Sequence, residues 1–121
     1  MPVPDEKLRD ALLALVGDAH GREIVMALTW RAKSATDLTY ELRIPASTVY
    51  RKIHELLESG VLRVERTVLQ PDGKKFEMYR STIRELKIDM RNDEIDLDVL
   101  MNPGPSERLG QLWKSLRKVR A

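Results

Sequence analysis

Residues 34–62, SATDLTYELRIPASTVYRKIHELLESGVL, contain the pattern that decides the fold. Ser34 and Asp37 match the capping pattern in which a hydroxyl precedes an acid by three residues, so we expect a helix to begin there and to end near Leu42. Pro45 disfavours helical geometry in the residue before it but is tolerated at the start of a helix. Two helices joined by so short a turn predict a helix-turn-helix.

The second helix of this pair is expected over residues 46–59. Val49, Ile53, Leu56 and Leu57 recur at helical spacing and form its apolar face, and a glycine at position 60 is typical of a helix C-terminus. The opposite face is polar and is therefore expected to point outward. This outward set supplies the candidate base-contacting residues Ser47, Thr48, Tyr50, Arg51 and His54.

The chemistry of the outward set suits the major groove of duplex DNA. Arg51 could donate two hydrogen bonds to guanine, and the ring of Tyr50 could contact a thymine methyl group. Ser47 and Thr48 could bond to phosphates or base edges. A solvated helix face without a binding role is the alternative, and for His54 a plain surface histidine is an equally good interpretation.

After Gly60 the apolar period changes from helical to two, which predicts strands over residues 61–69 and 75–80. The intervening sequence, QPDGK over residues 70–74, fits a tight hairpin turn. We interpret this ribbon, residues 61–80, as the wing that accompanies the helix-turn-helix. Charged hairpin turns also occur simply because turns are exposed. The candidate phosphate-contacting residues here are Lys74, Lys75, Arg63 and Arg66.

Two further helices are expected before this region. The first begins near Asp5 and ends at Gly17, with leucines at helical spacing. The second begins near Asp18, runs to about Trp30, and buries one apolar side. The residues expected to face the core on the second helix are Ile24, Val25 and Leu28.

The C-terminal part predicts another hairpin and a last helix. Alternating apolar residues occupy 86–90 and 95–99, and the acids between and beside them are better explained as an exposed polar face than as a cation site. After a Pro-Gly-Pro linker, Ser106 could cap an amphipathic helix. Its apolar face could pack against a partner subunit or back onto its own domain. The dimerisation residues that we predict are Leu109, Leu112, Trp113 and Leu116.

Composition excludes several classes of protein. The 121 residues carry a net charge of +2, so a uniformly basic, histone-like surface is not expected. The chain contains no cysteine, which excludes disulfides and thiolate metal sites. We find no catalytic motif and no metal or cofactor motif, so we expect neither an enzyme nor a cofactor. Without an apolar run that could span a bilayer or a signal sequence, a cytoplasmic protein is expected.

Residues 35–62 resemble winged-helix regulators of the arsenic-repressor (ArsR) type, and archaeal members above all, within a match that covers roughly residues 18–82. The most specific pieces are IPASTVYR, residues 44–51, and LLESGVL, residues 56–62. The resemblance implies a homodimer that reads a pseudo-palindromic operator with one recognition helix in each major groove. Metal-sensing members have cysteines in the helix before the recognition helix. This chain has Ala35, Leu38 and Leu42 there, so we do not expect metal-responsive repression.

The sequence thus predicts an α+β fold that is mainly helical: a winged helix-turn-helix with a C-terminal β-hairpin and a terminal amphipathic helix. We expect a DNA-binding domain over residues 1–83 and a dimerisation or interaction extension over residues 84–121. The predicted function is sequence-specific binding of double-stranded DNA by a homodimeric transcriptional regulator, most simply a repressor. The alternative is a winged-helix module that binds other proteins in a larger assembly. The sequence does not identify the operator or a small-molecule effector.

Overall fold

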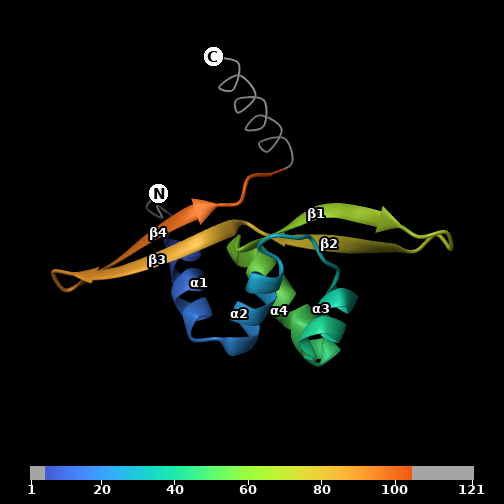
Figure 1. Ribbon diagram of the computed structural model, residues 1–121, viewed down its shortest axis with the longest axis horizontal. Helices are drawn as coiled ribbons and strands as arrows, with labels where there is room; N and C mark the ends of the chain where they lie inside the picture. The colour runs from blue at the N-terminus through green and yellow to red at the C-terminus, as the bar shows by residue number, and fades with distance from the viewer. Residues whose placement is uncertain (1–4, 105–121) are drawn as a thin grey trace, which may run out of the picture.

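The structure is a computed structural model that describes residues 5–104. Within this range four helices precede two antiparallel hairpins, which confirms the predicted α+β class. Figure 1 shows the hairpins extending in opposite directions from the middle of the molecule, with the helices gathered on one side of them. The predicted terminal helix, with Leu109, Leu112, Trp113 and Leu116, lies outside the described residues. The elements are α1 (Glu6–Val16), α2 (Ala19–Ala27), α3 (Ala35–Leu42), α4 (Ala46–Ser59), β1 (Leu62–Leu69), β2 (Lys75–Ser81), β3 (Ile83–Arg91) and β4 (Glu94–Met101).

Local sequence signals account for most helix ends. The Asp5 carboxylate accepts a hydrogen bond from the backbone amide of Lys7 at the start of α1. Ser34 and Asp37 form the predicted capping box, in which each side chain accepts a hydrogen bond from the other residue's backbone amide. Gly60 ends α4 with a φ of 85°, a left-handed conformation that glycine adopts without steric cost.

The prediction for α2 was wrong at its C-terminus, since this helix ends at Ala27 and not near Trp30. The backbone carbonyls that follow the helix accept hydrogen bonds from residues distant in the sequence. The amide of Ser81 donates to the carbonyl of Leu28, and the Nε of Arg80 donates to the carbonyl of Thr29. These contacts connect the end of α2 to β2, and a continued helix would not present its carbonyls to that strand.

The first hairpin, β1–β2, follows the predicted alternation. Its register runs from Leu62 opposite Ser81 to Leu69 opposite Lys75, with a shift between Val64 and Arg66. At the turn, Gly73 has a φ of 86° and donates its amide to the carbonyl of Gln70. The turn at residues 70–74 is therefore confirmed as the tight connection that its proline, aspartate and glycine predict.

The second hairpin, β3–β4, pairs the apolar residues of its two strands across one face. Leu86 lies opposite Val99, Ile88 opposite Leu97, and Met90 opposite Ile95. Asn92 and Asp93 form the two-residue turn, and both have positive φ values of 50° and 65°. Leu97 and Val99 are buried near the helices, whereas the face becomes exposed toward the turn.

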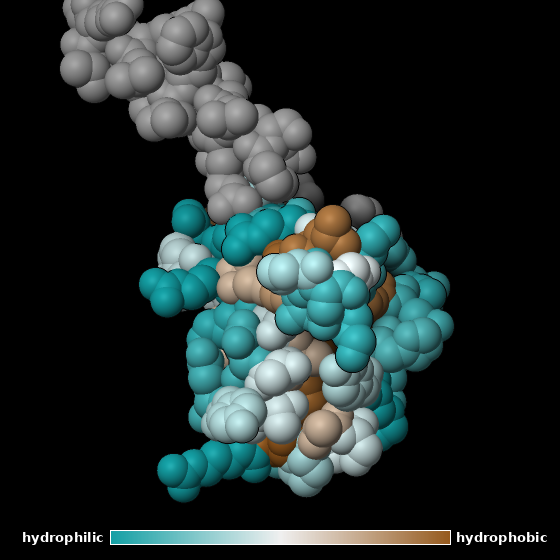
Figure 2. Space-filling view, turned by 90° about the vertical axis from the view of Figure 1, so that its right-hand side faces the viewer, coloured by the Kyte–Doolittle hydropathy of each residue, from teal (hydrophilic) through white to brown (hydrophobic). Residues whose placement is uncertain are grey.

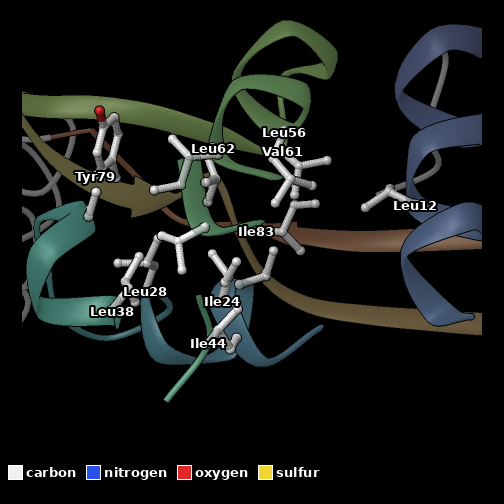
Figure 3. Close-up of a cluster of buried hydrophobic side chains, with 14 of the residues drawn as sticks. Leu12, Ile24, Leu28, Leu38, Ile44, Leu56, Val61, Leu62, Tyr79 and Ile83 are labelled. Carbon is white, nitrogen blue, oxygen red and sulfur yellow. The ribbon is translucent and has the colours of Figure 1, made fainter. Parts of the chain in front are cut away.

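One buried cluster connects the helices to both hairpins (Figure 3). Leu12 of α1, Ile24 of α2, Leu38 of α3 and Ile53 of α4 all belong to it. The hairpins contribute the residues nearest their common junction. These residues are Val61, Leu62, Tyr79, Ile83, Leu97 and Val99. Because the buried part of each hairpin lies at this junction, both turns extend away from the core.

Polar groups fix the junction between the hairpins. The buried amide side chain of Asn102 donates to the carbonyls of Thr29 and Ser81, at 2.6 and 3.1 Å. The backbone amide of Asn102 donates to Thr82, which alone separates β2 from β3. Arg63 of β1 donates to the carbonyls of Asn102 and Pro103, both at 2.9 Å. The end of β4 is thereby held against α2 and against the base of the first hairpin.

Candidate nucleic-acid interface

Helix α4 separates its apolar and polar residues onto opposite faces. Val49, Ile53 and Leu56 are buried in the core. Of the predicted outward set, Ser47, Tyr50, Arg51 and His54 are exposed, and Thr48 is half-buried. The structure therefore brings four of the five candidate residues onto the solvent-facing side of one helix.

The first turn of α4 is open to a ligand. Its N-cap is Pro45, which provides no side-chain cap, and Ala46 and Ser47 are both exposed. The first backbone amides of a helix have no acceptor within the helix and carry the positive end of its dipole. This end of α4 can therefore bind an anion such as a phosphate group.

Charge is unevenly distributed along the exposed face of α4. Arg51 lies 3.4 Å from Glu55, and His54 lies 3.2 Å from Glu58, each pair being separated by one helical turn. In both pairs the acid lies toward the C-terminus of α4, and the arginine or histidine lies toward its N-terminus. Such exposed pairs are weak, about 0.3–0.5 kcal/mol. The arginine can therefore leave Glu55 for a phosphate or a base at little cost.

A groove of about 380 Å³ connects α4 to the first hairpin. Tyr50 lines it from α4, and Lys75, Phe76 and Tyr79 line it from β2. The N-terminus of α3 contributes Ser34, Ala35 and Thr36. The candidate helix and the candidate hairpin thus form one continuous surface in space.

The sequence interpretation missed part of this groove. The sequence predicts Phe76 and Tyr79 only as strand residues and Thr36 only as part of a capping sequence. Their alternation and spacing give no sign that they face α4, because that juxtaposition depends on how β2 packs against α3.

Three of the four predicted basic residues on the first hairpin are exposed. Lys74 and Lys75 lie at the turn and the start of β2, and Arg66 lies on β1. Figure 2 faces the end of the molecule toward which this hairpin points, and hydrophilic side chains cover most of it. Arg63 is placed differently, because its guanidinium holds the carbonyls of Asn102 and Pro103 at the hairpin base. We therefore leave Arg63 out of the candidate interface.

Lys52, the residue after Arg51 in α4, is half-buried and forms an ion pair within the chain. Its ammonium lies 2.5 Å from the carboxylate of Asp18, the residue that precedes α2. The hydrogen bond from Lys52 lowers the pKa of the Asp18 carboxyl below its usual value of 3.8. This ion pair connects α4 to α2 and removes Lys52 from the set available to a ligand.

Tyr79 lies where the groove meets the core. Burial raises the pKa of its hydroxyl to about 12, and the neighbouring carboxylate of Glu77, to which the hydroxyl donates at 3.2 Å, adds to this effect. The hydroxyl donates its one proton to Glu77, so this hydrogen bond fixes the orientation of the Tyr79 hydroxyl beside the groove.

Within residues 5–104 no three histidine or acidic side chains lie close enough to hold a metal ion together. None of the helices described is both long and apolar enough to cross a bilayer. No model of a known protein family matches the chain, and no curated protein matches it. The resemblance to ArsR-type regulators therefore rests on the sequence pattern of the chain alone.

Proposed function

We propose that this chain is a winged helix-turn-helix protein that binds duplex DNA as a homodimer and regulates transcription, acting as a repressor. One observation carries the proposal. The exposed face of α4, with Ser47, Tyr50 and Arg51, lies beside a hairpin that has Lys74 and Lys75 at its turn. In this proposal α3 and α4 are the helix-turn-helix, α4 is the recognition helix, and β1–β2 is the wing.

The distribution of charge on α4 supports entry by its N-terminal half. In helix-turn-helix proteins the N-terminal residues of the recognition helix contact base edges in the major groove. Arg51 is long enough to reach the O6 and N7 of guanine, and Tyr50 can contact a thymine methyl. Glu55 and Glu58 lie nearer the C-terminus of α4, so they would stay away from the phosphates.

The remaining contacts are proposed to go to the DNA backbone. The open first turn of α4, at Ala46 and Ser47, suits one phosphate. Lys74 and Lys75 are proposed to contact the phosphates that flank the major groove, and Arg66 is proposed to make a further phosphate contact. Such contacts set affinity and salt dependence, and they carry little sequence information.

A homodimer is part of the proposal because one recognition helix reads only a few base pairs. A two-fold dimer presents two such helices to half-sites about one turn of DNA apart, roughly 34 Å. Residues 109–116 stay our predicted dimerisation segment.

Selection from a random duplex pool is the experiment that tests the proposal. The bound sequences are amplified, and the winning duplex and a scrambled control are titrated by fluorescence anisotropy at two salt concentrations. We expect enrichment of a two-fold motif, with affinity for the control falling faster with salt than affinity for the winner. Weak, salt-sensitive binding without enrichment would contradict the proposal and would favour a protein-binding module.

A further inference from the structure

The described residues contain an apolar groove that the proposed DNA contacts do not use. It has a volume of about 300 Å³ and lies between α1, α2 and β3. Its walls are mostly apolar, and the polar residues among them are Arg22, Thr29 and Arg84. The apolar residues include Leu12, Leu15, Val25, Met26, Leu86 and Ile88.

Large apolar side chains are left open to solvent at this groove. Met26 is 70% exposed, Val16 is 45% exposed and Ile88 is 39% exposed. The apolar surface continues from Ile88 along the second hairpin to Met90 and Ile95, which pair across its strands. A contiguous apolar surface of this kind, adjoined by a charged hairpin, is typical of an interaction site.

The chain itself supplies a segment of matching chemistry. Residues 106–121 lie outside the described range, and their sequence predicts a helix with one apolar face. From Leu109 to Val119 such a helix would extend about 15 Å at roughly 1.5 Å per residue. The groove wall from Ile83 to Ile88 extends roughly 16 Å at about 3.3 Å per residue. The apolar face and the groove are therefore of similar length.

The charges are complementary along the second hairpin, whereas Arg22 and Arg84 in the groove wall have the same sign as the segment. The second hairpin exposes acidic side chains, including Asp93, Glu94, Asp96 and Asp98. Residues 106–121 contain five basic residues and one acid, as SERLGQLWKSLRKVRA shows. A two-stranded ribbon is narrow, so the field of its acids also acts on a ligand at its apolar face. Opposite charges of this kind favour encounter and fix orientation.

The direction in which the chain leaves β4 argues for a segment from another molecule. The groove extends from Ile83 back toward the second turn. Arg63 holds the carbonyls of Asn102 and Pro103 at the base of the first hairpin, on the other side of the junction. At Pro103 the chain is therefore directed away from its own groove.

We propose that the groove between α1, α2 and β3 binds residues 106–121 of a second copy of this chain, and that two copies exchange these segments reciprocally. This inference rests on the homodimer of the proposed function and specifies its contacts. In a two-fold dimer the same exchange occurs twice, so both apolar grooves and both apolar helix faces are buried.

Disulfide cross-linking tests the exchange directly, because the natural chain has no cysteine. One variant carries Met26→Cys in the groove. A second variant carries Trp113→Cys in the terminal segment, together with an affinity tag that makes it larger than the first. The two are mixed and oxidised, and the products are separated without reductant. The control pair replaces Met26→Cys by Leu69→Cys, which is exposed on the first hairpin and lies outside the groove.

We expect the Met26 and Trp113 pair to give a covalent heterodimer several-fold faster than the control pair. A double variant with both cysteines should likewise form covalent dimers. If the double variant gave only an internally bridged monomer, or if the two pairs reacted equally, the proposal would be overturned.

A second test does not depend on DNA. A groove variant, Met26→Glu, should sediment as a monomer, and so should a segment variant that combines Leu112→Asp with Leu116→Asp. An equimolar mixture of the two variants should form a heterodimer, because the first supplies an intact segment and the second an intact groove. Dimers that persist in both variants would contradict the exchange. Arg51→Ala, added to both the Met26→Cys and the Trp113→Cys variants, should leave their rate of cross-linking unchanged, so a failure of DNA recognition and a failure of the exchange are distinguishable.

Discussion

The side-chain amide of Asn102 donates a 2.6 Å hydrogen bond to the backbone carbonyl of Thr29, across 73 residues of sequence. Asn102 is 4% exposed, and its second amide bond goes to Ser81. We expect Asn102→Ala to lower the free energy of unfolding by about 1–3 kcal/mol, because the carbonyl of Ser81 loses this donor and the carbonyl of Thr29 keeps only Arg80. Urea denaturation followed by circular dichroism measures the loss. Gln70→Ala at the exposed first turn should change stability by less than about 0.5 kcal/mol; equal losses would show that the junction is not a specific source of stability.

Arg51 and Tyr50 are expected to determine sequence preference. Arg51→Ala should weaken binding to the selected duplex by about 5- to 150-fold, the range for one lost bidentate base contact, and should relax preference at one position of each half-site. Tyr50→Ala should reduce specific binding in the same direction. Anisotropy titrations report affinity, and circular dichroism checks the fold. Glu58→Ala on the same helix is the matched control. If Arg51→Ala left the affinity for the selected duplex unchanged, Arg51 would not belong to the interface.

Lys74 and Lys75 are expected to act on affinity alone. Their joint replacement by alanine should weaken binding to the selected and scrambled duplexes by similar factors. It should also reduce the slope of log K against log salt by about one to two, as phosphate contacts are lost. Titrations over a range of salt concentrations give the slope. Lys87→Ala on the second hairpin should leave it unchanged, and a loss confined to the selected duplex would contradict a backbone role.

The ion pair between Lys52 and Asp18 gives stability a dependence on acid pH. The pKa of Asp18 is lowered in the folded state, so its contribution is present above pH 3.8 and is lost as pH falls through the folded value. Asp18→Asn should lower the free energy of unfolding by at most about 1 kcal/mol at neutral pH, since the pair is partly exposed. The difference from the unsubstituted chain should shrink toward zero in strong acid. Urea denaturation between pH 2 and 6 measures the free energy of unfolding of both chains. If the difference between them stayed constant with pH, this ion pair would not be its cause.

Tyr79 predicts a loss of stability at alkaline pH. Its pKa of about 12 in the folded protein exceeds the usual 10.0, so between these values the unfolded chain ionises and the folded chain does not. The contribution of the protonated Tyr79 hydroxyl to the free energy of unfolding is therefore complete below pH 10 and falls as pH rises to 12. Ultraviolet titration at 295 nm should show one of the three tyrosines ionising near 12, and Tyr79→Phe should remove that step. Normal titration of all tyrosines would contradict the burial of this hydroxyl.

Elements whose ends depend on neighbouring residues were predictable from the sequence. Ser34 and Asp37 determine the start of α3 through their mutual hydrogen bonds, and Gly60 ends α4 through its own backbone conformation. The turn at residues 70–74 follows from proline, aspartate and glycine in order. The polar face of α4 was predictable for the same reason, because helical geometry places Ser47, Tyr50 and Arg51 together.

Features that depend on distant partners were not predictable. The end of α2 at Ala27 reflects carbonyls taken by Arg80, Ser81 and Asn102, all more than fifty positions away. Arg63 looked like its exposed neighbours on β1 because the sequence does not reveal that Asn102 and Pro103 return beside it. The groove at Tyr50 likewise needs the packing of β2 against α3. In each case the missing information was tertiary pairing, which local spacing does not encode.

Thr82 alone separates β2 from β3, and this brevity restricts how the chain can change. Successive side chains along a strand point to opposite faces, and the register of β3 already shifts once, between Ile83 and Glu85. One residue added or removed at Thr82 would therefore turn the apolar face of the second hairpin outward and its acidic face toward α1. The outer turns carry no such restriction, because both hairpins can lengthen there by matched pairs of residues. Variation in length among proteins built on this plan should therefore accumulate at residues 70–74 and 91–94, with the junction invariant in length.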